Sequence, residues 1–462
     1  MLRRTTIVLA AVPAALALAG VDAAAGATST RADADRCAHA ERIRVPGAER
    51  QVAACLDDLT TAGTVASGHT VPADYAGLHA AGTRNPSGVP GVQIDGYFPD
   101  TSTFNTTHGW NHDSQFVIRL PERWNGGLVV SGSPGTRRQY ANDVTISDWV
   151  LAKGYAFAST DKGNSGAEFY RDGDRPGDAI AEWNHRTTQL TRAAKAVVAQ
   201  RYGRAPRRTY AAGISNGGYL VRWQLENRPE LYDGGVDAEG TLWRPDGPNL
   251  FTYLPPVLRA YPSYASTGSP AAHQAILDAG YTAGSEFLWE YHHTVYWGLT
   301  QRIYREELDP SYEGEDADYD YFARPKEVRK AVARISLTGR IRKPMLTLHG
   351  TYDSLLPIGK NSDLYAQMVH SKAKGKSKGK GKGKGSASAH SYYRYYRLET
   401  GNHVDGLYDA YPDKLRPLLP CMRAAFTALE RWTAPKGQAP PPSATLPRPA
   451  TGDLVNTCSL TR

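Results

Sequence analysis

Short apolar runs alternate with segments of helical periodicity across residues 128–240, and this alternation limits the folds open to the chain. Strand-like runs lie at 128–130, 155–159, 209–212 and 235–237. Segments with helical spacing of apolar side chains lie between them, at 146–153, 183–201 and 219–226. Because strands joined through a helix run parallel in one sheet, the pattern predicts an α/β fold with a mostly parallel central sheet and helices on both faces.

The predicted sheet has further strands on both sides of this region. Residues 92–98 and 116–120 alternate apolar and polar side chains like antiparallel strands. Apolar runs return at 345–348 and 392–398. The stretch 28–90 is rich in Ala, Gly and Thr and has few strand signals, so we expect it to wrap the surface.

Residues 241–335 interrupt the alternation and are rich in aromatic side chains. We expect them to form a cap inserted over the C-terminal edge of the sheet; a structural subdomain packed to one side is the alternative. The predicted parts of the chain are a signal peptide at 1–27, an N-terminal extension with the first part of the core at 28–240, the cap at 241–335, the second part of the core at 336–433 and a Pro-rich tail at 434–462.

The N-terminus has the layout of a secretory signal peptide. Arg3 and Arg4 precede an uncharged apolar stretch at 7–21, and small residues suited to cleavage follow at 23–27. A membrane anchor is the alternative, but the apolar stretch is shorter than the ~20 residues that a spanning helix needs. We therefore expect a secreted, extracellular protein without stable membrane insertion.

Export makes the four cysteines candidates for disulfide bonds, because oxidising compartments favour them. Proximity along the chain favours the pairs Cys37–Cys55 and Cys421–Cys458 over the other two connectivities. Each bridge would fix a terminal segment that has little periodicity of its own. The spacing of the cysteines does not match a zinc site.

The positive net charge comes mainly from one low-complexity segment. The chain has a formal net charge of +8, and the run from Lys372 to Lys384 contains seven lysines, which leaves 8 − 7 = +1 for the rest. We expect a flexible, solvated loop at 371–389. Since no folded segment shows clustered basic residues, nucleic-acid binding is not expected.

The sequence Gly213-Ile-Ser-Asn-Gly217 lies directly between a predicted strand and a predicted helix. In that position a sharp turn exposes the Ser215 hydroxyl above the sheet, and small residues are needed on either side. The free N–H groups of the following helix face any oxyanion that develops there. The motif therefore predicts a serine nucleophile, and a Gly-rich turn that only packs is the alternative.

A serine nucleophile needs a base and an acid that orients the base. Asp353 follows the strand at 345–348, and His403 follows the strand at 392–398, in the order along the chain that this architecture requires. We predict Asp353 as the acid and His403 as the base. Asp237 and Glu239, which follow the strand after the nucleophile helix, are alternative acids.

An oxyanion hole needs two N–H donors. The N–H of Asn216, next to the nucleophile, is the first candidate. The second belongs to the turn at 132–135, where Pro134 has no N–H, so Ser133 and Gly135 are the candidates.

Four side chains are candidates for substrate binding. Arg137 and Arg138 follow the turn and would bind a substrate carboxylate. Trp289 and Trp297 belong to the aromatic cap and would contact flat or apolar parts of a substrate. The histidines lack a His-Glu-x-x-His pattern, so neither a metal nor another cofactor is expected.

Several of these segments resemble the tannase and feruloyl esterase family of α/β-hydrolases. The resemblance lies in the segments 202–210, 213–218 and 231–236. The segment 159–166 and His185 on the following helix are also similar to that family's pattern. The run Ser-Asn-Gly-Gly also resembles exported hydrolases of 3-hydroxybutyrate oligomers.

The resemblance implies an α/β-hydrolase fold and a serine carboxylic ester hydrolase with Ser215, Asp353 and His403 as its triad. It further implies aromatic esters of the feruloyl or galloyl type, or short hydroxyalkanoate esters, as substrates. The tannase family usually has bridged cysteines where this chain has Ile214 and Val404. A serine peptidase or amidase on the same fold and a non-catalytic exported binding protein are the alternative functions.

Overall fold

The computed structural model describes residues 40–100, 109–112, 114–377 and 392–461. The predicted signal peptide, Cys37 of one predicted disulfide and most of the lysine-rich segment lie outside these residues. Within them, no helix combines the length and the apolar character that crossing a lipid bilayer requires.

Ten strands form one central sheet in the order β1-β2-β3-β5-β4-β6-β7-β8-β9-β10. The strands are β1 Arg50–Leu56, β2 Gly91–Phe98, β3 Ser114–Pro121, β4 Gly127–Gly132, β5 Ala156–Thr160, β6 Arg208–Ile214, β7 Gly234–Ala238, β8 Met345–Gly350, β9 Tyr393–Leu398 and β10 Ala444–Leu446. The pairs β1–β2, β2–β3 and β3–β5 are antiparallel, and all pairs from β5 to β10 are parallel. The prediction of a mostly parallel α/β sheet is confirmed.

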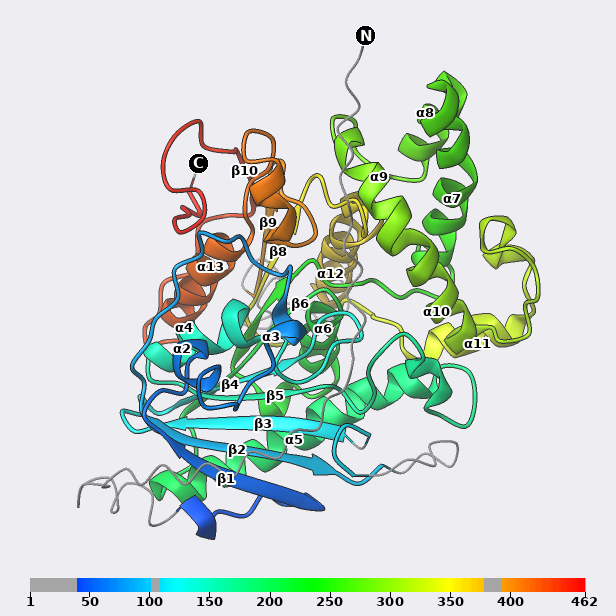
Figure 1. The fold of residues 1–462 in the computed structure, drawn as a ribbon. Helices are drawn as coiled ribbons and strands as arrows, with labels where there is room; N and C mark the ends of the chain where they lie inside the picture. Colours follow the sequence, from blue (N-terminus) through cyan, green and yellow to red (C-terminus); the bar gives the residue numbers. More distant parts are fainter. Residues whose placement is uncertain (1–39, 101–108, 113, 378–391, 462) are drawn as a thin grey trace.

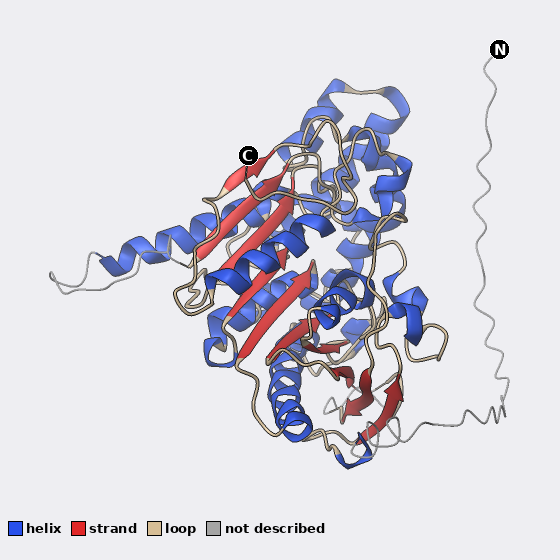
Figure 2. Cartoon of the chain, turned by 90° about the vertical axis from the view of Figure 1, so that its left-hand side faces the viewer, coloured by secondary structure: helices blue, strands red, loops and turns tan. Residues whose placement is uncertain are grey.

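Helices cover both faces of this sheet (Figure 2). On one face lie α5 Asp178–Tyr202, α6 Asn216–Asn227 and α12 Ser362–Ser377, which pack against strand residues such as Leu128 and Val130. On the other lie α4 Asp148–Ala152 and α13 Leu419–Trp432, which pack against residues such as Val129. The two sets of strand residues alternate because successive side chains of a strand point to opposite faces.

Between β7 and β8 the chain leaves the sheet for the segment 241–335. This segment forms α7 Leu250–Thr267, α8 Pro270–Asp278, α9 Trp289–His292, α10 Gly298–Leu308 and α11 Lys326–Arg334. Figure 1 shows these helices, in green to yellow, as a separate layer beside the sheet. We call residues 241–335 the cap.

The N-terminal part differs from the expectation drawn from its composition. Residues 28–90 show few strand signals and are expected to wrap the surface, yet β1 pairs along its whole length with β2. The short helices α2 Thr61–Thr64 and α3 Pro72–Tyr75 follow it. The run Arg-Gln-Val-Ala-Ala-Cys-Leu is only partly buried at an edge of the sheet, so its side chains show little of the apolar alternation of an inner strand.

The C-terminal part also adds structure that the sequence did not predict. β10, inside the Pro-rich tail, pairs with β9 in parallel. Residues 371–377 of the expected loop at 371–389 belong to α12 instead, and the rest of that segment lies outside the described residues. A disulfide joins Cys421 of α13 to Cys458 of the tail, which confirms one of the two expected pairs.

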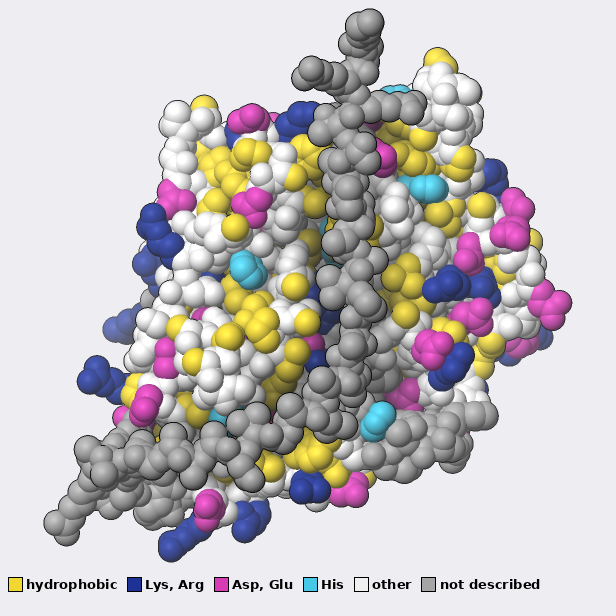
Figure 3. Space-filling view, viewed as in Figure 1, with side chains coloured by type: hydrophobic (Ala, Val, Ile, Leu, Met, Phe, Trp, Pro, Cys, Tyr) yellow, Lys and Arg dark blue, Asp and Glu magenta, His cyan; other side chains and the backbone are white. Residues whose placement is uncertain are grey.

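The described surface mixes both signs of charge. On the face seen in Figure 3, lysine and arginine side chains are interspersed with aspartate and glutamate, and they form no continuous basic field there. This agrees with the net charge of about +1 outside the lysine run, since 8 − 7 = 1. Binding to nucleic acid needs a clustered basic surface, which this face lacks.

Candidate active site

Ser215 lies on a strained turn between β6 and α6. Its backbone has φ 59° and ψ −121°, in a region that residues with a side chain rarely adopt. A Cβ on Gly213 would lie 2.3 Å from the carbonyl group of Gly217, and one on Gly217 would lie 2.6 Å from the carbonyl oxygen of Gly132. The two glycines of the motif are therefore required by the close approach of backbone segments around Ser215.

Three residues from three loops meet at the end of the parallel strands. Ser215 follows β6, Asp353 follows β8 and His403 follows β9. The Ser215 hydroxyl oxygen lies 2.9 Å from His403 Nε2, and His403 Nδ1 lies 2.8 Å from Asp353 Oδ2. All three are buried, with Ser215 8% exposed and His403 6% exposed. The arrangement is a continuous chain of hydrogen bonds from hydroxyl to imidazole to carboxylate.

Asp353 is held in place by its own loop and by a second histidine. Its Oδ1 accepts hydrogen bonds from the N–H groups of Leu355 and Leu356, at 2.8 and 2.7 Å. His349 Nε2 lies 3.0 Å from its Oδ2. Burial alone would raise the pKa of Asp353, but positive charge on His403 and the hydrogen bonds from both histidines hold it well below its usual range. Asp353 is therefore ionised, as an acid that supports an imidazolium must be.

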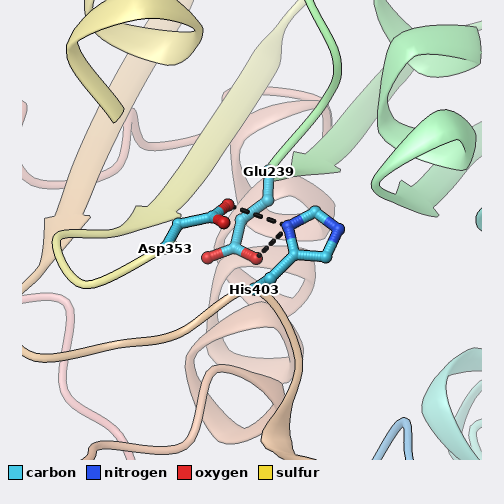
Figure 4. Close-up of side chains that lie close together, drawn as sticks. All are labelled: Glu239, Asp353 and His403. Atoms are coloured by element: carbon cyan, nitrogen blue, oxygen red, sulfur yellow. Dashed lines mark hydrogen bonds and ion pairs between the residues drawn. The ribbon is translucent and has the colours of Figure 1, made fainter. Parts of the chain in front are cut away.

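The two alternative acids occupy different positions. Asp237 accepts a hydrogen bond from Arg222 Nε at 2.6 Å, and both side chains are fully buried, so Asp237 is the partner of that guanidinium. Glu239, in contrast, places its Oε2 3.5 Å from His403 Nδ1. Figure 4 shows the imidazole of His403 facing the carboxyl groups of both Asp353 and Glu239. Asp353 makes the shorter contact, at 2.8 Å.

The structure separates the candidate donors of the oxyanion hole. Asn216 is the first residue of α6, so its N–H has no partner within the helix. Gly135 lines the same cleft as Ser215. Ser133 is not among the residues that line the cleft. Its N–H donates to the carbonyl oxygen of Thr160 at 3.0 Å, and its hydroxyl donates to the carbonyl oxygen of Arg137. The expectation for Ser133 is therefore wrong, since its N–H is used to continue the sheet.

The side chain of Asn216 has a role that the sequence did not indicate. Its Nδ2 donates to the carbonyl oxygen of Gly135 at 3.0 Å and to the hydroxyl of Tyr304 on the cap. Its Oδ1 accepts from the hydroxyl of Thr241. One amide thus connects three segments: the turn at 213–217 (the nucleophile turn), the turn at 132–135 (the glycine loop) and the cap. In the sequence, the only sign of this role is that Asn216 is a polar residue within the motif, and this does not specify its partners.

A cleft of about 500 Å³ opens over Ser215 and His403. Its walls come from the cap, from residues 76–78, from the glycine loop and from the loops after β8 and β9. The cap contributes Thr241, Leu250, Tyr291, His292, Tyr296, Leu299, Thr300, Ile303 and Tyr304. Burial lowers the pKa of His292 to about 4, so this histidine is neutral and the cap wall has no formal charge.

The two arginines predicted to bind substrate differ in position. Arg137 lines the cleft, and it is the one lysine, arginine, aspartate or glutamate among the described residues that do so. Its Nη1 donates to the carbonyl oxygens of Asp74 and Ala76 at 2.8 and 2.9 Å. Arg138 is not among the lining residues and pairs with the Asp74 carboxylate at 3.1 Å. The prediction for Arg138 is therefore wrong.

Neither predicted tryptophan lines the cleft. Trp289 and Trp297 are both fully buried inside the cap region. The indole N–H of Trp289 donates to the Ser285 hydroxyl at 3.0 Å, and that of Trp297 donates to the carbonyl oxygen of Ser354, beside Asp353, at 2.7 Å. The tryptophans of the aromatic-rich cap were expected at the substrate, but they form its core, and tyrosines line the cleft instead.

Two groups of described side chains bring possible metal ligands within 4.8 Å of one another. The first is Glu239, Asp353 and His403, in which the imidazole Nδ1 already pairs with Asp353. The second is Asp100, Asp172 and Glu182. Glu182 pairs with Arg186 at 2.6 Å, and Asp172 accepts from Asn164 at 3.2 Å. Some members of each group are therefore engaged with protein partners.

The sheet order, the strained serine turn and the histidine and acid on later loops define the α/β-hydrolase fold. Residues 101–239 match the family model described as "Tannase and feruloyl esterase", as the sequence motifs led us to expect. This match covers Ser215 and Glu239 but ends before Asp353.

A related protein and two solved structures extend this comparison. The chain is 30% identical over 146 residues to mono(2-hydroxyethyl) terephthalate hydrolase of Piscinibacter sakaiensis, covering 28% of this chain and 23% of that protein. The fold is similar to that of feruloyl esterase B from Aspergillus oryzae, with TM-score 0.55, 13% identity and coverage of 88% of this chain and 91% of that one. An esterase from the same organism has a TM-score of 0.54 and 14% identity, with coverage of 88% of this chain and 90% of that one.

Proposed function

We propose that this protein is an exported serine hydrolase of carboxylic esters that forms an acyl-enzyme on Ser215. The observation that supports it most directly is the hydrogen-bonded chain from Ser215 through His403 to Asp353, with contacts of 2.9 and 2.8 Å. The match of residues 101–239 to the tannase and feruloyl esterase model agrees with this chemistry. The disulfide between Cys421 and Cys458 supports export to an oxidising compartment.

In the first half of the reaction, the Ser215 oxygen attacks the ester carbonyl carbon while His403 Nε2 takes the hydroxyl proton. The carbonyl oxygen becomes an oxyanion, which the N–H groups of Asn216 and Gly135 stabilise. When the tetrahedral intermediate collapses, the bond to the alcohol oxygen breaks and His403 gives its proton to the leaving alcohol. An acyl ester of Ser215 remains.

Water completes the cycle by the same route. His403 takes a proton from a water molecule, whose oxygen attacks the acyl carbon and regenerates the oxyanion. Collapse breaks the bond to Ser215, which recovers its proton from His403, and the carboxylic acid leaves. Asp353 fixes the Nδ1–H tautomer throughout and stabilises the imidazolium.

For the substrate we propose an ester with a flat or compact acyl part, of the aromatic or the short hydroxyalkanoate type. The cap tyrosines offer such a group ring surfaces and hydroxyls in a cleft of about 500 Å³. Arg137 gives the cleft a positive charge, so an ester with a free carboxylate is the form we expect to bind best. The relative named for an ester of terephthalate agrees with an anionic aromatic substrate.

The serine mechanism is tested with Ser215→Ala and p-nitrophenyl butyrate. We expect loss of at least about 10⁴-fold in kcat at an unchanged melting temperature, whereas Thr300→Ala, on the cap wall, stays within a few-fold. Labelling by a fluorophosphonate should disappear with Ser215 alone. Hydrolysis retained by the Ser215 variant contradicts the proposal, and peptide amides cleaved faster than esters would favour the peptidase alternative. A wild-type protein that neither reacts nor hydrolyses would be the binding protein instead.

Substrate choice is tested with ethyl ferulate, methyl gallate and the linear dimer of 3-hydroxybutyrate. Monomethyl and dimethyl terephthalate then form a pair that differs in one negative charge. We expect Arg137→Gln to raise KM for the monomethyl ester about tenfold more than for the dimethyl ester. Arg138→Gln is the matched control, because Arg138 also bonds to Asp74 but does not line the cleft. Equal effects of the two variants would exclude Arg137 as the carboxylate partner.

A further inference from the structure

Glu239 lies at the end of β7, in a backbone conformation that points its carboxyl group toward His403. Its φ is 53°, in the left-handed region that favours glycine. Its N–H donates to the carbonyl oxygen of Leu348 at 2.9 Å, and its Oε1 accepts from the N–H of Gly350 at 2.8 Å. Two bonds to β8 therefore fix a glutamate where a glycine would meet less strain.

One oxygen of this carboxyl group remains without a hydrogen bond. Glu239 is fully buried, and its Oε2 has no hydrogen-bond partner among the described residues. That oxygen lies 3.5 Å from His403 Nδ1, the same nitrogen that Asp353 Oδ2 contacts at 2.8 Å. In Figure 4 both carboxyl groups face the same ring nitrogen of His403. Nδ1 thus has one close acceptor and a second just beyond hydrogen-bond distance.

The surroundings of Glu239 raise the pKa of its carboxyl group. Burial raises its pKa well above the usual range, and the nearby charges of Asp353, Asp405 and Asp237 raise it further, against the N–H of Gly350. His403 is the titratable base that it faces. Glu239 is therefore harder to ionise while Asp353 carries its charge.

The neighbouring acids have structural partners that Glu239 lacks. Asp237 pairs with Arg222, and Asp405 accepts from the N–H groups of Leu418 and Leu419 at the start of α13. Glu239 has neither a guanidinium nor a helix end to stabilise. Its left-handed backbone conformation and its unpaired oxygen both direct the carboxyl group toward the imidazole of His403.

We propose that Glu239 is a second acid partner of His403, a positioning residue whose Oε2 confines the imidazole beside Asp353 and accepts the Nδ1–H when Asp353 cannot. This inference rests on the serine mechanism proposed above. Removing the charge of Asp353 removes the charge that most opposes ionisation of Glu239. The glutamate then ionises more readily and stabilises the same tautomer and the same imidazolium.

Four variants test this role: Asp353→Asn, Glu239→Gln, their combination, and Asp353→Asn with Glu226→Gln. Asparagine keeps an oxygen for the N–H groups of Leu355 and Leu356 but presents an amide to His403. Glu226 is the matched control, because it is also a glutamate whose pKa burial raises, and it bonds to Thr338 and Gly339 away from the triad. The readouts are kcat, KM and the pH profile with p-nitrophenyl butyrate, together with the melting temperature.

We expect Glu239→Gln alone to lower kcat by less than about threefold, and Asp353→Asn to lower it by about 10². The combination with Glu239→Gln should lower kcat by about 10⁴, the usual cost of losing the triad acid, while the combination with Glu226→Gln should match Asp353→Asn. The residual kcat of Asp353→Asn should rise with pH as Glu239 ionises. That rise should be absent when Glu239 is also replaced.

Equal losses in Asp353→Asn and in its combination with Glu239→Gln would overturn the inference. If asparagine prevents folding, the smaller Asp353→Ser replaces it in each combination and the same comparison decides. Ser215→Ala is added to every background. Activity that persists without Ser215 would refute the serine mechanism itself, whereas activity that depends on Ser215 but not on Glu239 refutes only the second acid partner.

Discussion

The two halves of the cleft are built by different means. On the sheet side, Ser215, Asp353 and His403 are placed by turns that directly follow β6, β8 and β9, and backbone contacts fix each turn. On the covering side, the cap and residues 76–78 reach the cleft through side-chain packing. The first half therefore tolerates almost no change of backbone, whereas the second can exchange one side chain for another.

This difference separates chemistry from specificity. Glycine is required at 213 and 217 whatever the substrate is, because a Cβ there would lie only 2.3 and 2.6 Å from neighbouring backbone carbonyl groups. The tyrosines of the covering half meet no such constraint. We expect substitutions in the sheet half to act on kcat, and substitutions in the covering half to act on KM or on stability.

Among the substitutions that test this comparison of the two halves, Gly217→Ala should have the largest effect. The new methyl group would lie 2.6 Å from the carbonyl oxygen of Gly132, so the nucleophile turn and the glycine loop must separate. We expect kcat to fall at least about 10³-fold, because 1 Å of displacement at a reacting group costs roughly 10²-fold or more. Kinetics with p-nitrophenyl butyrate measure the loss, and Gly298→Ala, where a methyl group meets nothing within 4 Å, is the control. Near-normal kcat would show that the turn can relax.

A second prediction concerns the core of the cap. Trp289 is fully buried, and its ring packs edge-on against Tyr264 at 5.2 Å between centroids. Trp289→Ala should lower the free energy of unfolding by about 3–5 kcal/mol, as large-to-small changes in a core do. Since Trp289 does not line the cleft, kcat of the folded fraction should stay within about twofold. Denaturant unfolding and active-site titration measure the two quantities, and a large fall in kcat would contradict the separation of the halves.

A third prediction tests how the N-terminal part of the covering half is fixed to the sheet. Asp148 accepts from the N–H and hydroxyl of Thr61, at 3.1 and 2.6 Å. Burial, followed by the charge of Asp143, raises the pKa of Asp148 to about 7. The folded protein therefore holds a proton that the unfolded chain releases near pH 4, so this stabilisation is full below about pH 4 and is lost as the pH rises toward 7.

Asp148→Asn should remove that dependence, which is on the order of 3 kcal/mol between pH 4 and pH 8. The measurement is the free energy of unfolding of both proteins at several pH values across this range. We expect the free energy of unfolding of the variant to rise steadily relative to that of the wild type as the pH rises. Parallel curves would mean that Asp148 is ionised at all these pH values.

The sheet half follows from the sequence because strand ends, turn motifs and chain order are local or ordered signals. The apolar runs predicted β4 to β9, and their order along the chain placed Ser215, Asp353 and His403 at one edge. The edge strands β1 and β10 escaped this reasoning, since they are short or only partly buried. For Ser133 the sequence could not show that its N–H would continue the sheet.

The covering half did not follow, because the aromatic content of a helix does not say which face is buried. Trp289 and Trp297 were expected at the substrate, yet both are inside the cap. Arg137 and Arg138 are adjacent in sequence, but only Arg137 lines the cleft, whereas Arg138 pairs with the Asp74 carboxylate. The position of Glu239 beside His403 depends on a left-handed residue, for which a glutamate gives no signal.

The smallest effect is expected where the two halves meet. The Tyr304 hydroxyl on the cap contacts Asn216 Nδ2, and Tyr304→Phe removes that contact while keeping the ring. Asn216 would retain its bond to Gly135 at 3.0 Å, so we expect kcat to fall only about tenfold, which corresponds to roughly 1.4 kcal/mol of transition-state stabilisation. Tyr296→Phe, on the same wall, should change KM alone, because Tyr296 lines the cleft without bonding to Asn216. Equal changes of kcat in both variants would mean that the cap acts on the nucleophile through general packing rather than through this single hydrogen bond.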